Sequence, residues 1–80
     1  MELKRTVAYV RWFDSAIYKG EPCRPDELSG ICHNESAGLV VDEDKDKITL
    51  ALDRCLDTQD VRLVISIPKA NVTSIRRFRA

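Results

Sequence analysis

The side chains best suited to chemistry in this sequence are aromatic and charged residues between positions 11 and 18. Trp12, Phe13 and Tyr18 lie close together in the chain, and aromatic faces stack on nucleobases or on guanidinium groups. Arg11 is interspersed with them and suits a phosphate group, whereas neighbouring Asp14 and Ser15 suit hydrogen bonds to a ribose or a base edge. The cluster predicts binding of a nucleotide-type ligand.

The same residues also have a structural interpretation. A tryptophan on a strand, such as Trp12, is more often part of the core than a platform for a ligand, because large aromatic side chains are mostly buried. Asp14 and Ser15, at the end of a predicted strand, also fit a turn held by bonds from side chain to backbone. Both interpretations stay open at this level.

No pattern in the sequence predicts catalysis. His33 is the single histidine, and the chain has no G-x-S-x-G elbow, phosphate loop or pair of metal-binding histidines. Asp42, Asp44 and Asp46 resemble part of a calcium loop but lack its glycine and distal glutamate. We therefore expect a protein without catalytic residues, metal ions or cofactors.

The cysteines and the apolar segments bear on the compartment. Three cysteines, an odd number, predict free thiols, and the spacing of Cys23, Cys32 and Cys55 matches no closed zinc site. The first residues lack the apolar segment of a signal peptide, and no apolar run approaches the roughly 20 residues that span a bilayer. We expect a soluble cytoplasmic protein that does not enter membranes.

Charge is balanced overall but unevenly distributed. With 13 basic and 13 acidic residues the formal net charge is zero, which argues against a non-specific nucleic-acid binder. Residues 42–60 hold seven acidic and three basic side chains, a net charge of −4, whereas residues 69–79 hold four basic side chains and no acid. Either the two segments neutralise each other across strands, or the second forms a basic patch for phosphate that includes Lys69 and Arg77.

The two adjacent arginines near the end of the chain illustrate that choice. Arg76 and Arg77 are consecutive, so on a strand their side chains point to opposite faces. One of them can then line a site while the other faces solvent. Basic side chains on a final strand also protect a sheet edge from unwanted pairing.

Alternating apolar residues predict an all-β fold, a single small domain over residues 1–80. The expected order is a strand, a long loop, three strands joined by polar turns, a one-turn 3₁₀ helix and a last strand. Such an order is typical of a five-stranded SH3-like barrel; an open meander covered by a helix is the alternative. The strands are expected at residues 5–13, 36–42, 48–53, 61–67 and 72–78, the long loop at 14–35 and the 3₁₀ turn at 69–71.

Four short motifs in this order resemble a group of small proteins encoded by phages and prophages. They are Val10-x-Trp12-x-Asp14-Ser15, Ser36-Ala37-Gly38-Leu39-Val40, Ile48-Thr49-Leu50-Ala51 and Ile67-Pro68-Lys69-x-x-Val72-x-x-Ile75-Arg76. The resemblance covers most of the chain except the long loop, and many members carry Gly-Trp in place of Gly38-Leu39. Some small phage proteins of this size are sponges, which sequester the nucleotide signals of bacterial immunity without cleaving them.

The resemblance and the aromatic and basic cluster together predict a non-enzymatic counter-defence protein that sequesters a small cyclic nucleotide. A small barrel offers little concavity, so we expect a homo-oligomer with the ligand between subunits. Two alternatives remain: an SH3-like module whose long loop grips a host protein, and an Sm-like or SH3-like nucleic-acid binder that uses the C-terminal arginines. The residues expected to line the ligand site are Arg11, Trp12, Asp14, Ser15, Tyr18, Lys69 and Arg77.

Overall fold

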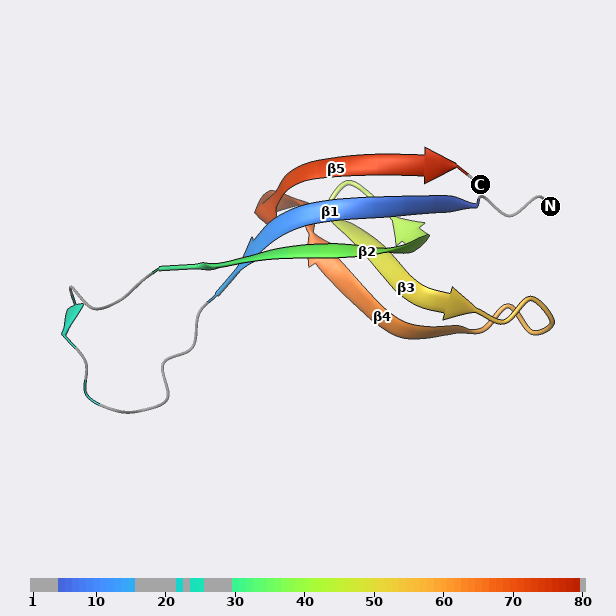
Figure 1. The fold of residues 1–80 in the computed structure, drawn as a ribbon, viewed down its shortest axis with the longest axis horizontal. Helices are drawn as coiled ribbons and strands as arrows, with labels where there is room; N and C mark the ends of the chain where they lie inside the picture. The colour runs from blue at the N-terminus through green and yellow to red at the C-terminus, as the bar shows by residue number, and fades with distance from the viewer. Residues whose placement is uncertain (1–4, 16–21, 23, 26–29, 80) are drawn as a thin grey trace.

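The protein forms one antiparallel sheet of five strands, shown in Figure 1, with almost no helix. The computed structural model describes residues 5–15, 22, 24–25 and 30–79. The order of strands across the sheet is β4-β3-β2-β1-β5, so β5 crosses to the edge beside β1. The elements are β1 (Thr6–Asp14), β2 (Cys32–Glu43), β3 (Lys47–Arg54), β4 (Val61–Pro68), the 3₁₀ turn η2 (Lys69–Asn71) and β5 (Val72–Arg79).

The predicted all-β class and the predicted turn before the last strand are both confirmed. The sheet, however, is not closed into a barrel: β4 and β5 are its two edges, and they do not pair with each other. In the part of the chain that the structure describes, no helix is long and apolar enough to cross a membrane.

The predicted boundaries of the long loop are wrong at both ends. β1 continues through Asp14 and β2 begins at Cys32, so residues 32–35 belong to a strand. Asp14 lies opposite Cys32, and Arg11 lies opposite Glu35. These strand ends are largely polar, and a ladder of backbone hydrogen bonds forms without apolar alternation. Hydrophobic periodicity therefore could not reveal them.

β2 is shared by two halves of the sheet. Its first part, from Cys32 to Leu39, pairs with β1, whereas its second part pairs with β3 from Leu39 onward. A Cβ atom on Gly38 would lie 2.7 Å from the carbonyl oxygen of Ala51, closer than Cβ atoms approach other atoms. Glycine at this position therefore lets the backbone of β2 pass close to β3 where the strand changes partner.

The core lies between these halves. β1 contributes Ala8 and Val10, as the alternation of the first strand indicates, and a bulge in the pairing of β1 with β5 turns both Val72 and Ile75 toward them. Both side chains therefore face the core. The fully buried cluster is small and consists of Ala8, Val10, Ile48, Leu50 and Ile67, with Trp12, Val40, Val72 and Ile75 packed against it.

The close approach at Gly38 gives a direct test of the path of β2. We call the place where β2 changes partner from β1 to β3 the bend of β2. Gly38→Ala places a methyl group against the backbone of Ala51, and a backbone atom yields only if the strands separate. We expect the variant to be about 1–3 kcal/mol less stable in thermal or urea unfolding. Ala37→Ser, which adds one atom at the exposed neighbouring position, should stay near wild type. A Gly38→Ala protein of wild-type stability would show that β2 and β3 need not approach so closely.

Candidate anion-binding site

The predicted ligand residues near the end of β1 lie together, but several of them serve the fold. The indole Nε1 of Trp12 donates a hydrogen bond of 3.0 Å to Ser36 Oγ, and its ring packs against the core. Asp14 Oδ1 accepts the backbone N–H of the neighbouring Ser15 at 2.7 Å, so this carboxylate bonds to local backbone. Arg11 is exposed. Tyr18 lies outside the described residues.

A small hollow of about 250 Å³ does lie beside this part of β1. Arg11 and Trp12 line it from β1, facing Asn34 on β2 and Thr73 on β5. Because Trp12 already uses its single donor on Ser36, the indole offers a ligand mainly its ring edge. A ligand-binding role for these residues stays a prediction.

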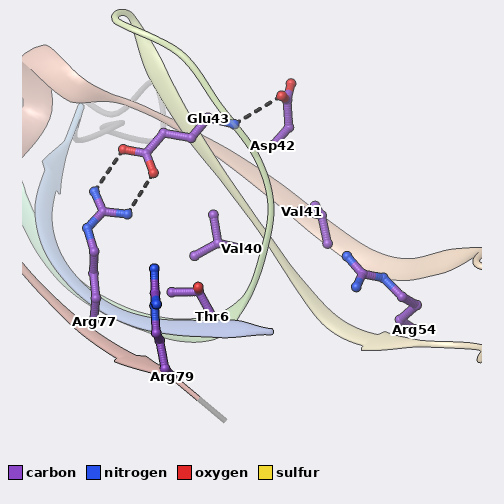
Figure 2. A pocket seen from close by; sticks show the side chains of 8 residues that line it. All are labelled: Thr6, Val40, Val41, Asp42, Glu43, Arg54, Arg77 and Arg79. Carbon is purple, nitrogen blue, oxygen red and sulfur yellow. Dashed lines mark hydrogen bonds and ion pairs between the residues drawn. The ribbon is translucent and has the colours of Figure 1, made fainter. Parts of the chain in front are cut away.

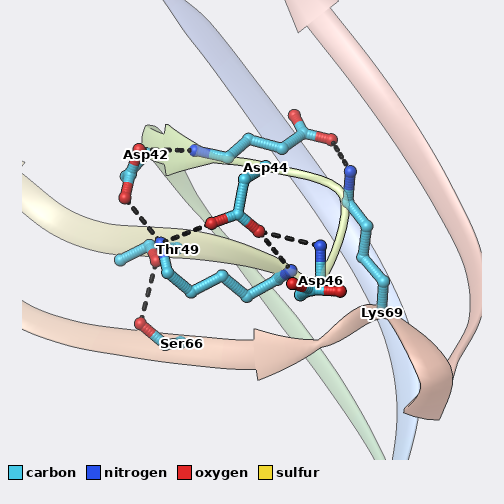
Figure 3. A network of polar contacts seen from close by, with 8 residues as sticks. Asp42, Asp44, Asp46, Thr49, Ser66 and Lys69 are labelled. Carbon is cyan, nitrogen blue, oxygen red and sulfur yellow. Dashed lines mark hydrogen bonds and ion pairs between the residues drawn. The ribbon is translucent and has the colours of Figure 1, made fainter.

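The two remaining predicted residues, Lys69 and Arg77, meet at the carboxylate of Glu43. Arg77 donates from Nη1 to Oε1 at 2.6 Å and from Nη2 to Oε2 at 2.8 Å, and Lys69 Nζ lies 2.8 Å from Oε2 (Figures 2 and 3). Hydrogen bonds from Arg77 and then Lys69 lower the pKa of Glu43 to about 2. The end of β2, the turn η2 and β5 are thereby tied together by one acidic side chain.

Arg77 also borders a larger hollow of about 670 Å³, drawn in Figure 2. Two further arginines line it: Arg54 from the end of β3 and Arg79 from the end of β5. Val40 adds an apolar side chain to the lining, and Thr6 adds a hydroxyl group. The full lining is Thr6, Val40, Val41, Asp42, Glu43, Arg54, Arg77 and Arg79.

The charges around this larger hollow do not cancel. Asp42 is paired with Lys47, and Glu43 with both Lys69 and Arg77. Arg54 and Arg79 make no ion pair with any residue that the structure describes. Each acid at the hollow therefore has its own cation while two guanidinium groups remain uncompensated, and such an arrangement attracts an anion.

Strand geometry explains which C-terminal arginines reach the hollow. Residues two apart on a strand share a face, so Arg77 and Arg79 both line it. Arg76 points the other way and sits over the ring of Phe78, with its guanidinium carbon 6.0 Å from the ring centre. The expectation that Arg76 and Arg77 take opposite roles agrees with this placement.

The hairpin between β2 and β3 fixes Lys69 in place, as Figure 3 shows. Asp44 Oδ1 accepts the backbone N–H groups of Asp46 and Lys47 at 2.8 and 2.9 Å, which shapes the tight turn. The carbonyl of Asp46 then accepts the backbone N–H of Lys69 at 2.8 Å. The acidic turn between β2 and β3 therefore has a structural role. The Asp44 carboxylate holds the backbone of the turn, and the Asp46 carbonyl anchors η2.

Sequence reasoning missed three members of this site: Glu43, Arg54 and Arg79. Arg79 was within reach, because it stands two residues after Arg77 and so must share its face. Glu43 and Arg54 come from the ends of β2 and β3, and only the bend of β2 brings them beside β5. No spacing in the sequence signals that proximity.

Comparison with known proteins gives no relative from which a function can be transferred. No protein-family model matches the chain, and neither a curated protein nor a solved structure matches it. The function must therefore be inferred from the geometry of the site itself.

The ion pairs of Glu43 predict an acid-dependent stability. Its pKa lies below the ordinary value of 4.5, so the stabilisation is fully present above pH 4.5 and is lost as the pH falls toward about 2. Glu43→Gln and, more weakly, Arg77→Gln should flatten the dependence of the melting temperature on pH in that interval. Calorimetry at a series of pH values measures this slope. Variants that keep the wild-type slope would show that Glu43 contributes little to acid unfolding.

Proposed function

We propose that this protein binds a small nucleotide-type ligand through its phosphate groups and does not cleave it. The larger hollow carries the proposal, because two uncompensated arginines and a third in a bidentate pair line one concave surface. Planar guanidinium groups match phosphate oxygens with two parallel hydrogen bonds, and this makes arginine the preferred residue for such ligands. A volume of about 670 Å³ is within the usual range for small-molecule sites.

The walls of the hollow suit the rest of a nucleotide. Val40 and Val41 give an apolar surface on which a base or sugar can lie, and Thr6 offers a hydroxyl. Of the ligand residues expected from the sequence, Arg77 lines this hollow and Lys69 helps to hold its Glu43.

Binding without hydrolysis agrees with the state of the acids at the site. A general base works best with a pKa near the working pH, whereas the pKa of Glu43 is about 2 because Arg77 and Lys69 hold its charge. The pKa of Asp42 is likewise lowered, first by its bond from Lys47. Both carboxylates are thus poor proton acceptors.

The biological setting of this proposal comes from the phage-protein resemblance of the sequence motifs. We propose a counter-defence role, in which the protein sequesters a cyclic nucleotide that signals bacterial immunity. We further propose an SH3-like relationship for the fold, supported by the strand order β4-β3-β2-β1-β5 and by the one-turn η2 between β4 and β5.

Removing the uncompensated charges should weaken binding. We expect Arg54→Gln together with Arg79→Gln to lower affinity for phosphate-bearing nucleotides by about tenfold or more, the effect of losing charge-assisted hydrogen bonds. Isothermal titration with cyclic AMP, a cyclic dinucleotide and inorganic phosphate measures the change. Arg79→Gln alone, which removes one of the two charges, is compared with Arg76→Gln as its matched control, because Arg76→Gln removes one charge from the other face of β5.

The outcomes of this titration separate clearly. A wild-type protein that takes up none of these probes, or an Arg76→Gln protein as weak as the double variant, would contradict the site. Chromatography of the recovered ligand tests the second half of the proposal, and a hydrolysed nucleotide would contradict binding without cleavage. Weaker binding at higher salt is expected, because salt screens exposed charges.

Substitution of Glu43 should have the opposite effect on binding. Glu43→Gln removes the anion that already occupies Arg77 and Lys69, so both cations become free to meet phosphate. We therefore expect tighter nucleotide binding from a variant that is less stable as a fold. Titration at neutral pH with the same probes measures it, and weaker binding by a folded Glu43→Gln protein would argue against phosphate at this hollow.

A further inference from the structure

A second surface carries several exposed apolar side chains. It is the arm formed by residues 52–65, which comprises the end of β3, the following turn and the first part of β4. Figure 1 shows this hairpin diverging from β1 and β5. The exposed fractions of Leu52, Leu56 and Leu63 are 63%, 72% and 76%, and Val64 and Ile65 are also exposed. Single apolar residues are normal on a surface, whereas five exposed ones in one hairpin point to an interaction surface.

The arm also holds a strained residue. Leu63 has a φ of 53°, in the left-handed region that leucine rarely adopts. It stands opposite Leu52, and these two residues are skipped in a ladder that pairs Ala51 with Val64 and Asp53 with Arg62. An exposed apolar side chain held at a conformational cost indicates a function for that side chain.

β4 is moreover an open edge of the sheet. Among the described residues its outer side has no partner strand, and the same is true of β5 at the other edge. Edge strands are usually protected by charges or prolines. β5 carries three arginines, but β4 has apolar side chains on both faces and only Arg62 as a charge between Val61 and Pro68. β4 is therefore the edge that most needs a partner.

The two edges complement each other in charge. The turn at the tip of the arm carries Asp57 and Asp60, whereas β5 carries Arg76 and Arg79 beside the half-exposed Phe78. If β4 of one copy lay antiparallel to β5 of another, the start of β4, next to Asp60, would meet the arginine-rich end of β5. A parallel arrangement would place those acids beside Thr73 and Ser74, away from the arginines.

We propose that β4 of one copy of this chain pairs antiparallel with β5 of a second copy. The pairing satisfies the open backbone groups of both edges, covers Leu63 and Phe78, and brings opposite charges together. Each copy has one edge of each kind and uses a different edge toward each neighbour, so the contact is head to tail and closes into a ring or continues as a chain. It rests on the sheet edges and shares Arg79 with the charged hollow, but the variants that test it lie at Leu63 and Phe78, outside that hollow.

Edge-blocking variants test the proposal. Leu63→Lys places a cation on β4 against the arginines of a neighbouring β5. Phe78→Lys places a cation on β5 against the apolar side chains of a neighbouring β4. Native mass spectrometry and light scattering should show wild-type protein as an assembly and each variant as a single chain. Ile31→Lys, an equally simple change at an exposed apolar residue outside both edges, should leave the assembly intact. Circular dichroism of each variant confirms that the sheet is retained.

Mixing the two variants gives the decisive result. The intact β5 of the Leu63→Lys protein can still pair with the intact β4 of the Phe78→Lys protein, so an equal mixture should form dimers with one chain of each. Leu63→Asn, which tolerates a positive φ, repeats the test if the lysine variant fails to fold. A single-chain wild type, a mixture that stays unassociated, or an assembly lost with Leu63→Lys but kept with Phe78→Lys would each overturn the proposal.

Discussion

The bend of β2 is the constraint on which the rest of this structure depends. One strand pairs first with β1 and then with β3, and Gly38 permits the close backbone approach at the change of partner. The bend lets residues of β1 and β3 share a core although β2 lies between them. It also carries Glu43 to β5, where Glu43 forms an ion pair with Arg77. Core and charged hollow are therefore two results of one backbone path.

Local patterns in the sequence were sufficient to predict the strands, but not to predict whether the sheet closes into a barrel. Alternation in residues 61–67 and the proline that follows predicted β4 and its end, and the segment 69–71 predicted η2. Polar pairing between Arg11 and Glu35 left no periodic signal, so the length of β2 was underestimated. Whether the edges of the sheet meet depends on backbone curvature over the whole chain, which no short window of residues encodes.

The candidate site shows the same division between local and long-range information. Strand alternation alone separates Arg77 from Arg76, and it could also have added Arg79. The pairing of Arg77 with Glu43 joins residues 34 positions apart, and the uncompensated state of Arg54 follows only from where its neighbours lie. Trp12 has the chemistry of a ligand platform, yet its bond to Ser36 shows that the core interpretation accounts for the ring. The acidic segment 42–60 and the basic segment 69–79 neutralise each other in part, through Glu43 with Lys69 and Arg77. A phosphate-binding role for the basic segment stays a prediction.

The fixed charge state of the hollow has a consequence for how the protein would respond to its surroundings. Guanidinium groups stay protonated and Glu43 stays ionised across the whole range between about pH 5 and pH 9. The pKa of Asp42, the other acid at the site, is also held below its ordinary value by its bond from Lys47. An anion site built in this way would keep its charge over that whole interval of pH, so its occupancy would depend on the competing anions around it and not on mild changes of acidity.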